Sequence, residues 1–187
     1  NLYHSFSHHS AFSHTNKEYM LQSINSSLAE SSQHLKSANY LFITFGSAWV
    51  YEAAESGKVV ANCHKLPAKN FLRRRVSVEE IVECISATLE NLFTINPNIK
   101  AVLTVSPIRH LKDGIHENSL SKSTLLLACE ELQKIFKERV SYLPTYEVLL
   151  DELRDYRFYA DDMAHPSKKA VEYIWEKIED EVITPNS

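Results

Sequence analysis

The sequence lacks several features that would assign it at once to a class of protein. No apolar run approaches the ~18 residues that a membrane span requires, and no signal-peptide pattern opens the chain. Its cysteines, Cys63, Cys84 and Cys129, form no C-x-x-C pair, which argues against both a disulfide framework and a cysteine zinc site. We therefore expect a cytoplasmic protein with reduced thiols that does not bind a membrane.

An excess of basic residues is also missing. The formal net charge is −4, so the chain has no basic footprint of the kind that nucleic-acid binding needs. Hydrophobic residues make up 44% of the sequence and charged residues 24%, as is typical of soluble globular proteins. The length of 187 residues predicts one domain over 1–187, and the charge favours a small neutral or sugar-like ligand over nucleic acid.

Short apolar runs alternate with helical patterns along the chain. The β-rich runs lie at 41–45, 101–106 and 140–143, with a smaller segment at 58–61. Helical patterns lie at about 15–37, 77–95, 122–139 and 145–154, and from about 167 onward. Alternation of this kind predicts an α/β fold with a mostly parallel sheet.

Local signals mark where several helices begin. Thr15 with Glu18, and Ser77 with Glu80, have the spacing of a capping box. The last helix begins at about Ser167, and its apolar residues recur at helical spacing, which predicts a buried face. The residues of that face are Val171, Ile174, Trp175, Ile178 and Val182.

Only three strands of the parallel sheet can be counted, whereas a typical sheet has ~5 or 6. The chain also begins at Asn1 rather than at a methionine. We therefore expect a part of a longer protein whose first strand or strands lie upstream. An exposed sheet edge would favour a homo-oligomer, or pairing with the missing N-terminal segment.

The most informative motif is RFYADDMAHPS near the C-terminus. Asp162 precedes His165 by three residues, so its carboxylate can accept the Nδ1 proton and leave Nε2 as a general base. Asp161 is the competing partner, and the alternative is a loop that merely caps the next helix. No G-D-S or G-x-S-x-G string occurs. The sequence therefore indicates the histidine and the aspartate of a Ser-His-Asp triad but not its serine nucleophile.

Three loops are expected to meet at one edge of the sheet, because the carboxyl ends of parallel strands lie together. They are Gly46-Ser47, the segment 106–110 and the segment 162–165. Ser47 is the in-chain serine placed most like a nucleophile, although a simple turn explains it as well. Gly46 is a candidate oxyanion donor through its backbone.

Histidines and an arginine supply further candidates. Arg109 and His110 follow a buried strand, and they either hold a substrate oxygen or pair with Asp155 or Asp113. His8 and His9 belong to a histidine-rich start of the chain and are candidates for lining a polar site. A metal site built from His4 and His8 with either His9 or His14 is the lesser alternative, because no H-E-x-x-H pattern or matched carboxylate accompanies them.

Several long strings resemble the GSCFA domain, a family found mainly in Bacteroidetes and grouped with the SGNH hydrolases. They are FGSAWVYE, VVANCHKLPA, TVSPIRHLKDG, LSKSTLLLA and DELRDYRFYADDMAHPS, and the resemblance runs from HSFSHHSAF to the last helix. It implies a three-layer α/β/α sandwich and a hydrolase with a serine nucleophile. In that group the D-x-x-H residues, here Asp162 and His165, supply the acid and base.

Two departures from the family pattern matter. The G-S-C-F-A string does not occur, so the resemblance puts the serine upstream of Asn1. The oxyanion block G-x-N-D is also absent, because Ala48 and Trp49 follow Gly46 where the amide residue would stand, and Asn62 is the substitute candidate.

These observations lead to two hypotheses from different classes. The first is a serine esterase or deacylase that acts on a small ester or an acylated carbohydrate and uses no cofactor or metal. The second is a non-catalytic module on a hydrolase scaffold that binds carbohydrate or a protein partner.

Overall fold

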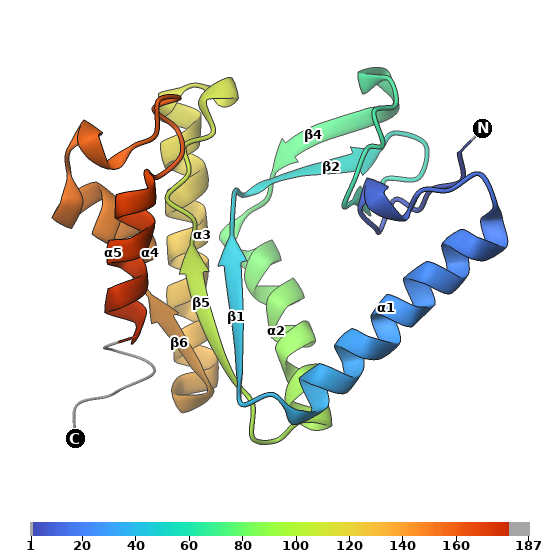
Figure 1. Cartoon of the computed structure of the whole chain (residues 1–187), viewed down its shortest axis with the longest axis horizontal. Coiled ribbons are helices and arrows are strands. Elements are labelled where there is room, and N and C mark those ends of the chain that lie inside the picture. Colours follow the sequence, from blue (N-terminus) through green and yellow to red (C-terminus); the bar gives the residue numbers. More distant parts are fainter. Residues whose placement is uncertain (1, 180–187) are drawn as a thin grey trace.

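A parallel sheet of three strands forms the centre of the computed structural model, which describes residues 2–179 (Figure 1). Strands β1 (Tyr40–Phe45), β5 (Lys100–Val105) and β6 (Val140–Leu143) lie in the order β1-β5-β6. Tyr40 is in register with Lys100, and Ala101 with Val140. Five consecutive residues of β5 are buried, because this strand has neighbours on both edges and is covered on both faces.

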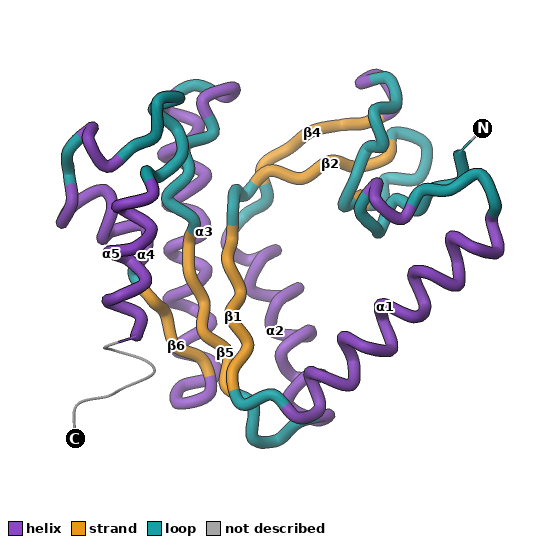
Figure 2. The backbone as a smooth tube through the Cα atoms, viewed as in Figure 1, coloured by secondary structure: helices purple, strands orange, loops and turns teal. Residues whose placement is uncertain are grey.

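Helices cover the two faces of this sheet unequally. Helices α2 (Val78–Ile95) and α3 (Ile115–Phe136) pack on one face, where Leu89, Leu103 and Leu132 are fully buried. Helix α5 (Lys168–Ile178) lies on the other face, with the short α4 (Thr145–Glu147) and a π-helical segment, Val148–Leu153 (Figures 1 and 2). This arrangement confirms the predicted α/β fold with helices on both faces of a parallel sheet.

A small antiparallel sheet stands apart from the parallel one. It consists of β2 (Trp49–Ala53), β3 (Val59–Val60) and β4 (Phe71–Arg75), in the order β3-β2-β4. Helix α1 (Lys17–Ser37) runs from the N-terminal segment, which lies near this small sheet, to the start of β1 (Figure 1). The sequence predicts a β segment at 58–61 but misses β2 and β4, whose half-exposed residues lack a clean alternation.

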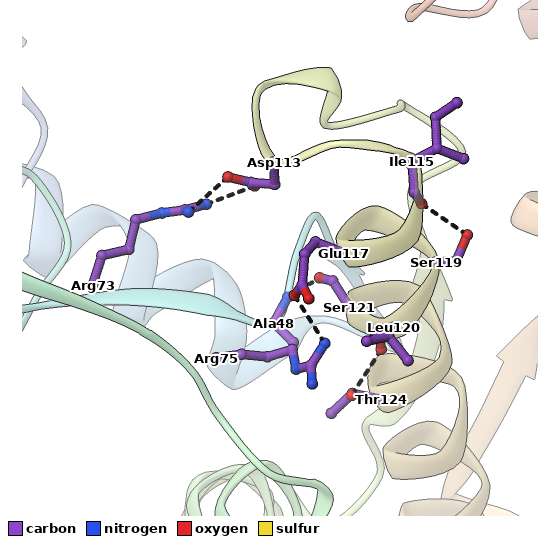
Figure 3. A network of polar contacts seen from close by, with 10 residues as sticks. All are labelled: Ala48, Arg73, Arg75, Asp113, Ile115, Glu117, Ser119, Leu120, Ser121 and Thr124. Atoms are coloured by element: carbon purple, nitrogen blue, oxygen red, sulfur yellow. Dashed lines mark hydrogen bonds and ion pairs between the residues drawn. The ribbon is translucent and has the colours of Figure 1, made fainter.

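Charged side chains join the small sheet to the strand-end loops of the larger one. The Arg73 guanidinium donates to both carboxylate oxygens of Asp113, at 2.6 and 2.7 Å, and Arg75 pairs with Glu117 at 3.2 Å (Figure 3). The hydroxyl of Ser121 on α3 accepts the Ala48 N–H at 2.8 Å. The short segment between β1 and β2 is therefore held directly against α3.

The helix signals in the sequence are partly confirmed. The Ser77 and Glu80 capping box is present, with both of its reciprocal hydrogen bonds. The first helix, in contrast, is capped by Asn16, whose carboxamide oxygen accepts the Tyr19 N–H at 2.8 Å, so the predicted Thr15 and Glu18 box is wrong. Asn16 lies one residue closer to the first turn, where its side chain reaches the free amides.

Other expectations need correction. Helix α3 begins at Ile115 rather than near 122, because Gly114, with φ +84°, ends the preceding turn and starts the helix at once. On α5, Ile174 is buried, but Val171 and Trp175 are more than half exposed and do not form the predicted buried face. Val182 lies outside the described residues. Among residues 2–179, no helix combines the length and the apolar character needed to cross a bilayer.

The buried centre of β5 makes a direct test of this core. Replacement of Leu103, which is fully buried, by Ala should lower the free energy of unfolding by about 2–5 kcal/mol, because it leaves a cavity between β5 and the α2 and α3 helices. Leu72→Ala, at a position 61% exposed, is the matched control and should change it by less than about 0.5 kcal/mol. Urea denaturation measures both, and equal effects would contradict the assigned core.

Candidate active site

A turn between η6 (Tyr156–Phe158) and α5 holds Asp162 and His165 together. Oδ2 of Asp162 lies 2.5 Å from Nδ1 of His165, while Oδ1 accepts the N–H groups of Ala164 and His165, each at 2.9 Å. A carboxylate can only accept, so the proton lies on Nδ1 and Nε2 is left as the free acceptor of the ring. The partner of His165 is thus Asp162 and not Asp161.

The three hydrogen bonds to Asp162 also set its charge. The N–H groups of His165 and Ala164, followed by the His165 ring, stabilise the carboxylate and lower the pKa of Asp162 to about 2. Both side chains are about half exposed, at 51% for Asp162 and 58% for His165. The carboxylate is therefore ionised at neutral pH, and its exposure to water keeps the opposing effect of desolvation small.

The loop that carries this pair is closed on itself. The Ala160 N–H donates to the His165 carbonyl at 2.8 Å, and the Ser167 N–H donates to the Phe158 carbonyl at 2.8 Å. Met163 adopts φ +57° at the tip of the turn, which turns the chain back toward the start of α5. Pro166 keeps His165 extended at the N-terminus of that helix.

An apolar groove begins at His165 and runs along the sheet face that α5 covers. Its volume is about 610 Å³, and it is lined by side chains of β1, the end of β5 and α5. The side chains that line it include Phe42, Thr44, Thr104, Ser106, Ile108, His165, Val171 and Trp175. Phe42 is 46% exposed because no helix covers β1 on this face. His165 is thus one of the side chains that a ligand in this groove would contact.

The predicted meeting of the three loops at the carboxyl edge is confirmed. The last rung between β1 and β5 is the bond from the Ser106 N–H to the Phe45 carbonyl, at 2.9 Å. Beyond it, Nε2 of His110 lies 3.2 Å from the Gly46 carbonyl, and the Arg109 N–H donates to the Ala164 carbonyl at 3.1 Å. Arg109 and His110 therefore join the His165 loop to the end of β1.

Arg109 and His110 have different surroundings. The Arg109 guanidinium lies over the Tyr159 ring, 4.0 Å from its centroid, and one of its nitrogens donates to the Met163 carbonyl at 3.4 Å. Neither residue is paired with Asp113 or Asp155 in the described ion pairs, since those carboxylates bind Arg73 and Arg157.

A buried lysine lies directly beneath these strand ends. Lys122 on α3 is 1% exposed, and its ammonium donates to the carbonyls of Gly46 and Ser106, each at 2.6 Å. The ion pairs found within residues 2–179 do not include it. Burial away from water lowers the pKa of Lys122 to about 8. Among the described residues, the groups that bind this ammonium are two backbone carbonyls, whose dipoles oppose its positive charge.

The remaining sequence candidates lie elsewhere. Ser47 lines a different pocket, between β1 and α2, and its hydroxyl accepts the Trp49 N–H at 3.4 Å. Asn62 follows β3 in the small sheet, and its side-chain oxygen accepts the His64 N–H at 2.8 Å. Neither residue lines the groove that contains His165.

The histidine-rich start packs near the small sheet and not at the groove. Nδ1 of His9 accepts the Ala11 N–H at 3.2 Å, and Nδ1 of His8 lies 2.8 Å from the Ser5 hydroxyl oxygen. His4 stacks on His64 with ring centroids 4.5 Å apart. Between residues 2 and 179, no three His, Cys, Asp or Glu side chains are grouped so that they could hold a metal ion.

The sequence does not single out Lys122, whereas Ser106 belongs to the segment 106–110 that is expected at this edge. Ser106 lines the groove with His165, although its hydroxyl also accepts the Ile108 N–H at 3.3 Å. Lys122 looks in the sequence like one of several polar residues on a helix. It stands about where the sequence predicts the helix to begin, next to Ser121, and no local pattern sets it apart.

A parallel sheet between two layers of helices, with a carboxylate and histidine pair beyond its strand ends, defines this chain as an α/β protein. The family model described as GSCFA family matches residues 1–178, and the chain belongs to that family. No curated protein matches its sequence.

One solved structure that resembles the chain is an acetyl xylan esterase from the rumen bacterium Butyrivibrio proteoclasticus. The two sequences are 16% identical, and the TM-score is 0.39. The likeness covers 77% of this chain, which spans only 37% of the length of the esterase chain.

The charge of Asp162 can be tested by its titration. The carboxyl carbon of Asp162 should titrate with a midpoint near 2, below the unperturbed aspartate value of about 3.9, as followed by ¹³C NMR. Its stabilising contribution is therefore present above about pH 4 and is lost as the pH falls toward 2. In His165→Ala the midpoint should rise but stay below 3.9, because the two backbone donors remain. A midpoint at the ordinary value would contradict the observed geometry.

Proposed function

We propose that this chain provides the acid and base of a serine ester or acyl hydrolase of the SGNH type, an esterase or deacylase that acts on an acylated carbohydrate. The observation that carries the proposal is the 2.5 Å contact between Asp162 and Nδ1 of His165, which leaves Nε2 available beside an open groove. The nucleophile in this proposal is a serine from a segment upstream of Asn1.

The roles of the residues follow from the proton positions. Nε2 of His165 takes the proton of the serine as its oxygen attacks the acyl carbon, and then gives that proton to the leaving alcohol. Water next attacks the acyl-enzyme, again losing its proton to His165, and the serine is released with its proton restored. Asp162 remains ionised throughout and stabilises the imidazolium that forms twice in each cycle.

The substrate contacts in this proposal come from the same edge of the sheet. The turn at Gly46 presents backbone groups to the oxyanion, and His110, whose ring lies against that turn, contacts the alcohol part of the substrate. Arg109 contacts the substrate in this proposal, and its N–H also supports the His165 loop through the bond to the Ala164 carbonyl. The distant position of Asn62 gives no support to its role as an oxyanion donor.

The edge of β1 offers a place for the segment that carries the serine. β1 is an edge strand of six residues with no proline and no charge, and Tyr40 and Phe42 on its open face are nearly half exposed. Such an edge favours pairing with another strand. We propose that an upstream strand pairs here and brings its serine to the carboxyl edge of the sheet, next to His165.

Turnover separates this proposal from its alternatives. The 187-residue chain alone should not hydrolyse p-nitrophenyl acetate, whereas a longer protein with the upstream serine should, and His165→Ala in that protein should lower kcat by about 10⁴-fold. Ser47→Ala is the control and should leave kcat unchanged. Turnover by the chain alone that is lost in Ser47→Ala would instead identify Ser47 as the nucleophile.

A fluorophosphonate probe tests the non-catalytic alternative with the same longer protein. The hydrolase should react covalently at the upstream serine, and the His165→Ala variant should react far more slowly. No reaction, together with carbohydrate binding that His165→Ala leaves unchanged, would favour a binding module.

The open edge predicts a difference in association. The 187-residue chain alone should self-associate with increasing concentration, as measured by light scattering, because no described strand pairs with the outer edge of β1. The longer protein should remain monomeric at the same concentrations, because its own strand occupies that edge. Phe42→Lys places a charge on the open face and should reduce association of the short chain. Equal association of both proteins would contradict the proposed pairing.

A further inference from the structure

Lys122 is a buried cation for which the proposed catalytic steps assign no role. Its side chain is the largest of those that are almost completely buried, and burial of a charge is costly unless it is compensated. Lys134, on the same helix, shows the usual alternative, since it is exposed and pairs with Glu130 and Glu131. The compensation at Lys122 consists instead of the two short bonds to the Gly46 and Ser106 carbonyls.

These two carbonyls belong to the residues that directly follow β1 and β5. The regular ladder between the strands ends with the bond from Ser106 to Phe45, and Lys122 binds the next carbonyl of each strand. The ammonium thereby fixes the level at which both strands stop and turn. Ser106 is also one of the residues that line the groove with His165.

The Gly46 carbonyl determines the direction of the next N–H group. The peptide bond is planar and trans here, so its C=O and N–H point to opposite sides. The bond to Lys122 therefore turns the Ser47 N–H away from the lysine, and a charged donor on the carbonyl polarises the whole peptide unit. The following N–H, of Ala48, is already bound by the Ser121 hydroxyl. Ser47 thus provides the N–H of this turn that is not held by α3.

We propose that Lys122 is a positioning residue of the hydrolase site, which holds the Gly46 carbonyl so that the Ser47 N–H is presented as a hydrogen-bond donor to the oxyanion of the reaction. This inference rests on the proposed function. It assigns Ser47 a role through its backbone and not its hydroxyl, which agrees with the position of that hydroxyl in the pocket on the other face of the sheet.

The test uses the longer protein with its upstream serine. Lys122→Met should lower kcat at least tenfold while KM changes by less than about twofold, because an oxyanion donor acts mainly in the transition state. The matched control is Lys134→Met on the exposed side of α3, which should retain the kcat of the unmodified protein. Lys122→Gln, which keeps a donor without the charge, should have an intermediate kcat.

A spectroscopic measurement on the same variants reports on the peptide itself. The amide proton of Ser47 should move upfield in Lys122→Met, and by a smaller amount in Lys122→Gln, with no change in Lys134→Met. Far-UV circular dichroism checks that each variant is folded. If Lys122→Met does not fold, the kcat and the Ser47 amide shift of Lys122→Gln test the positioning role in its place.

The outcomes distinguish this inference from the proposed function. If His165→Ala abolishes turnover and Lys122→Gln keeps both the kcat and the Ser47 amide shift of the unmodified protein, the positioning role is overturned and the hydrolase is not. If His165→Ala retains full turnover, the proposed function fails and the oxyanion role fails with it.

Discussion

The parallel pairing of β1 with β5 is the interaction on which the rest of the site depends. Its register ends the two strands at the same level, so that Gly46 and Ser106 stand side by side at the carboxyl edge. A shift of one residue would turn Phe42 and Thr44 from the groove toward the α2 and α3 core. It would also move one carbonyl away from Lys122. The core and the site are therefore fixed by the same set of backbone hydrogen bonds.

The acid–base pair is built in a different way. Asp162 and His165 lie within one tight turn, and two backbone N–H groups of that turn hold the carboxylate. Their mutual geometry is thus local, but their place beside the sheet depends on long-range bonds from Arg109 to the carbonyls of Ala164 and Met163. The contact with Asp162 determines which ring nitrogen of His165 carries the proton, whereas the fold determines which groove this histidine lines.

This division explains what the sequence could reveal. The strands at 41–45, 101–106 and 140–143, the Ser77 cap and the D-x-x-H pair are local patterns, and all of them are found within a residue or so of their predicted place. The roles of Lys122 and Ser106, in contrast, depend on contacts with residues far away in the chain, which no local pattern reveals. The sequence misses strands β2 and β4 because their stability comes from cross-strand pairs and from arginine contacts with α3 and the turn before it, which leave no periodic pattern.

The links between the two sheets differ in kind from those within them. Strand β5 is held by buried apolar contacts, whereas the small sheet is joined to the α3 side through Arg73 with Asp113 and Arg75 with Glu117 (Figure 3). Dissolved ions weaken the attraction between exposed charges, with a screening length of about 10 Å at 0.1 M that shortens as salt is added, but leave apolar packing in place. Arg75 and Glu117 are both about a third or more exposed, whereas Asp113 is almost covered. Raising the ionic strength would therefore loosen the junction of the sheets at Arg75 first, while the parallel sheet keeps its shape.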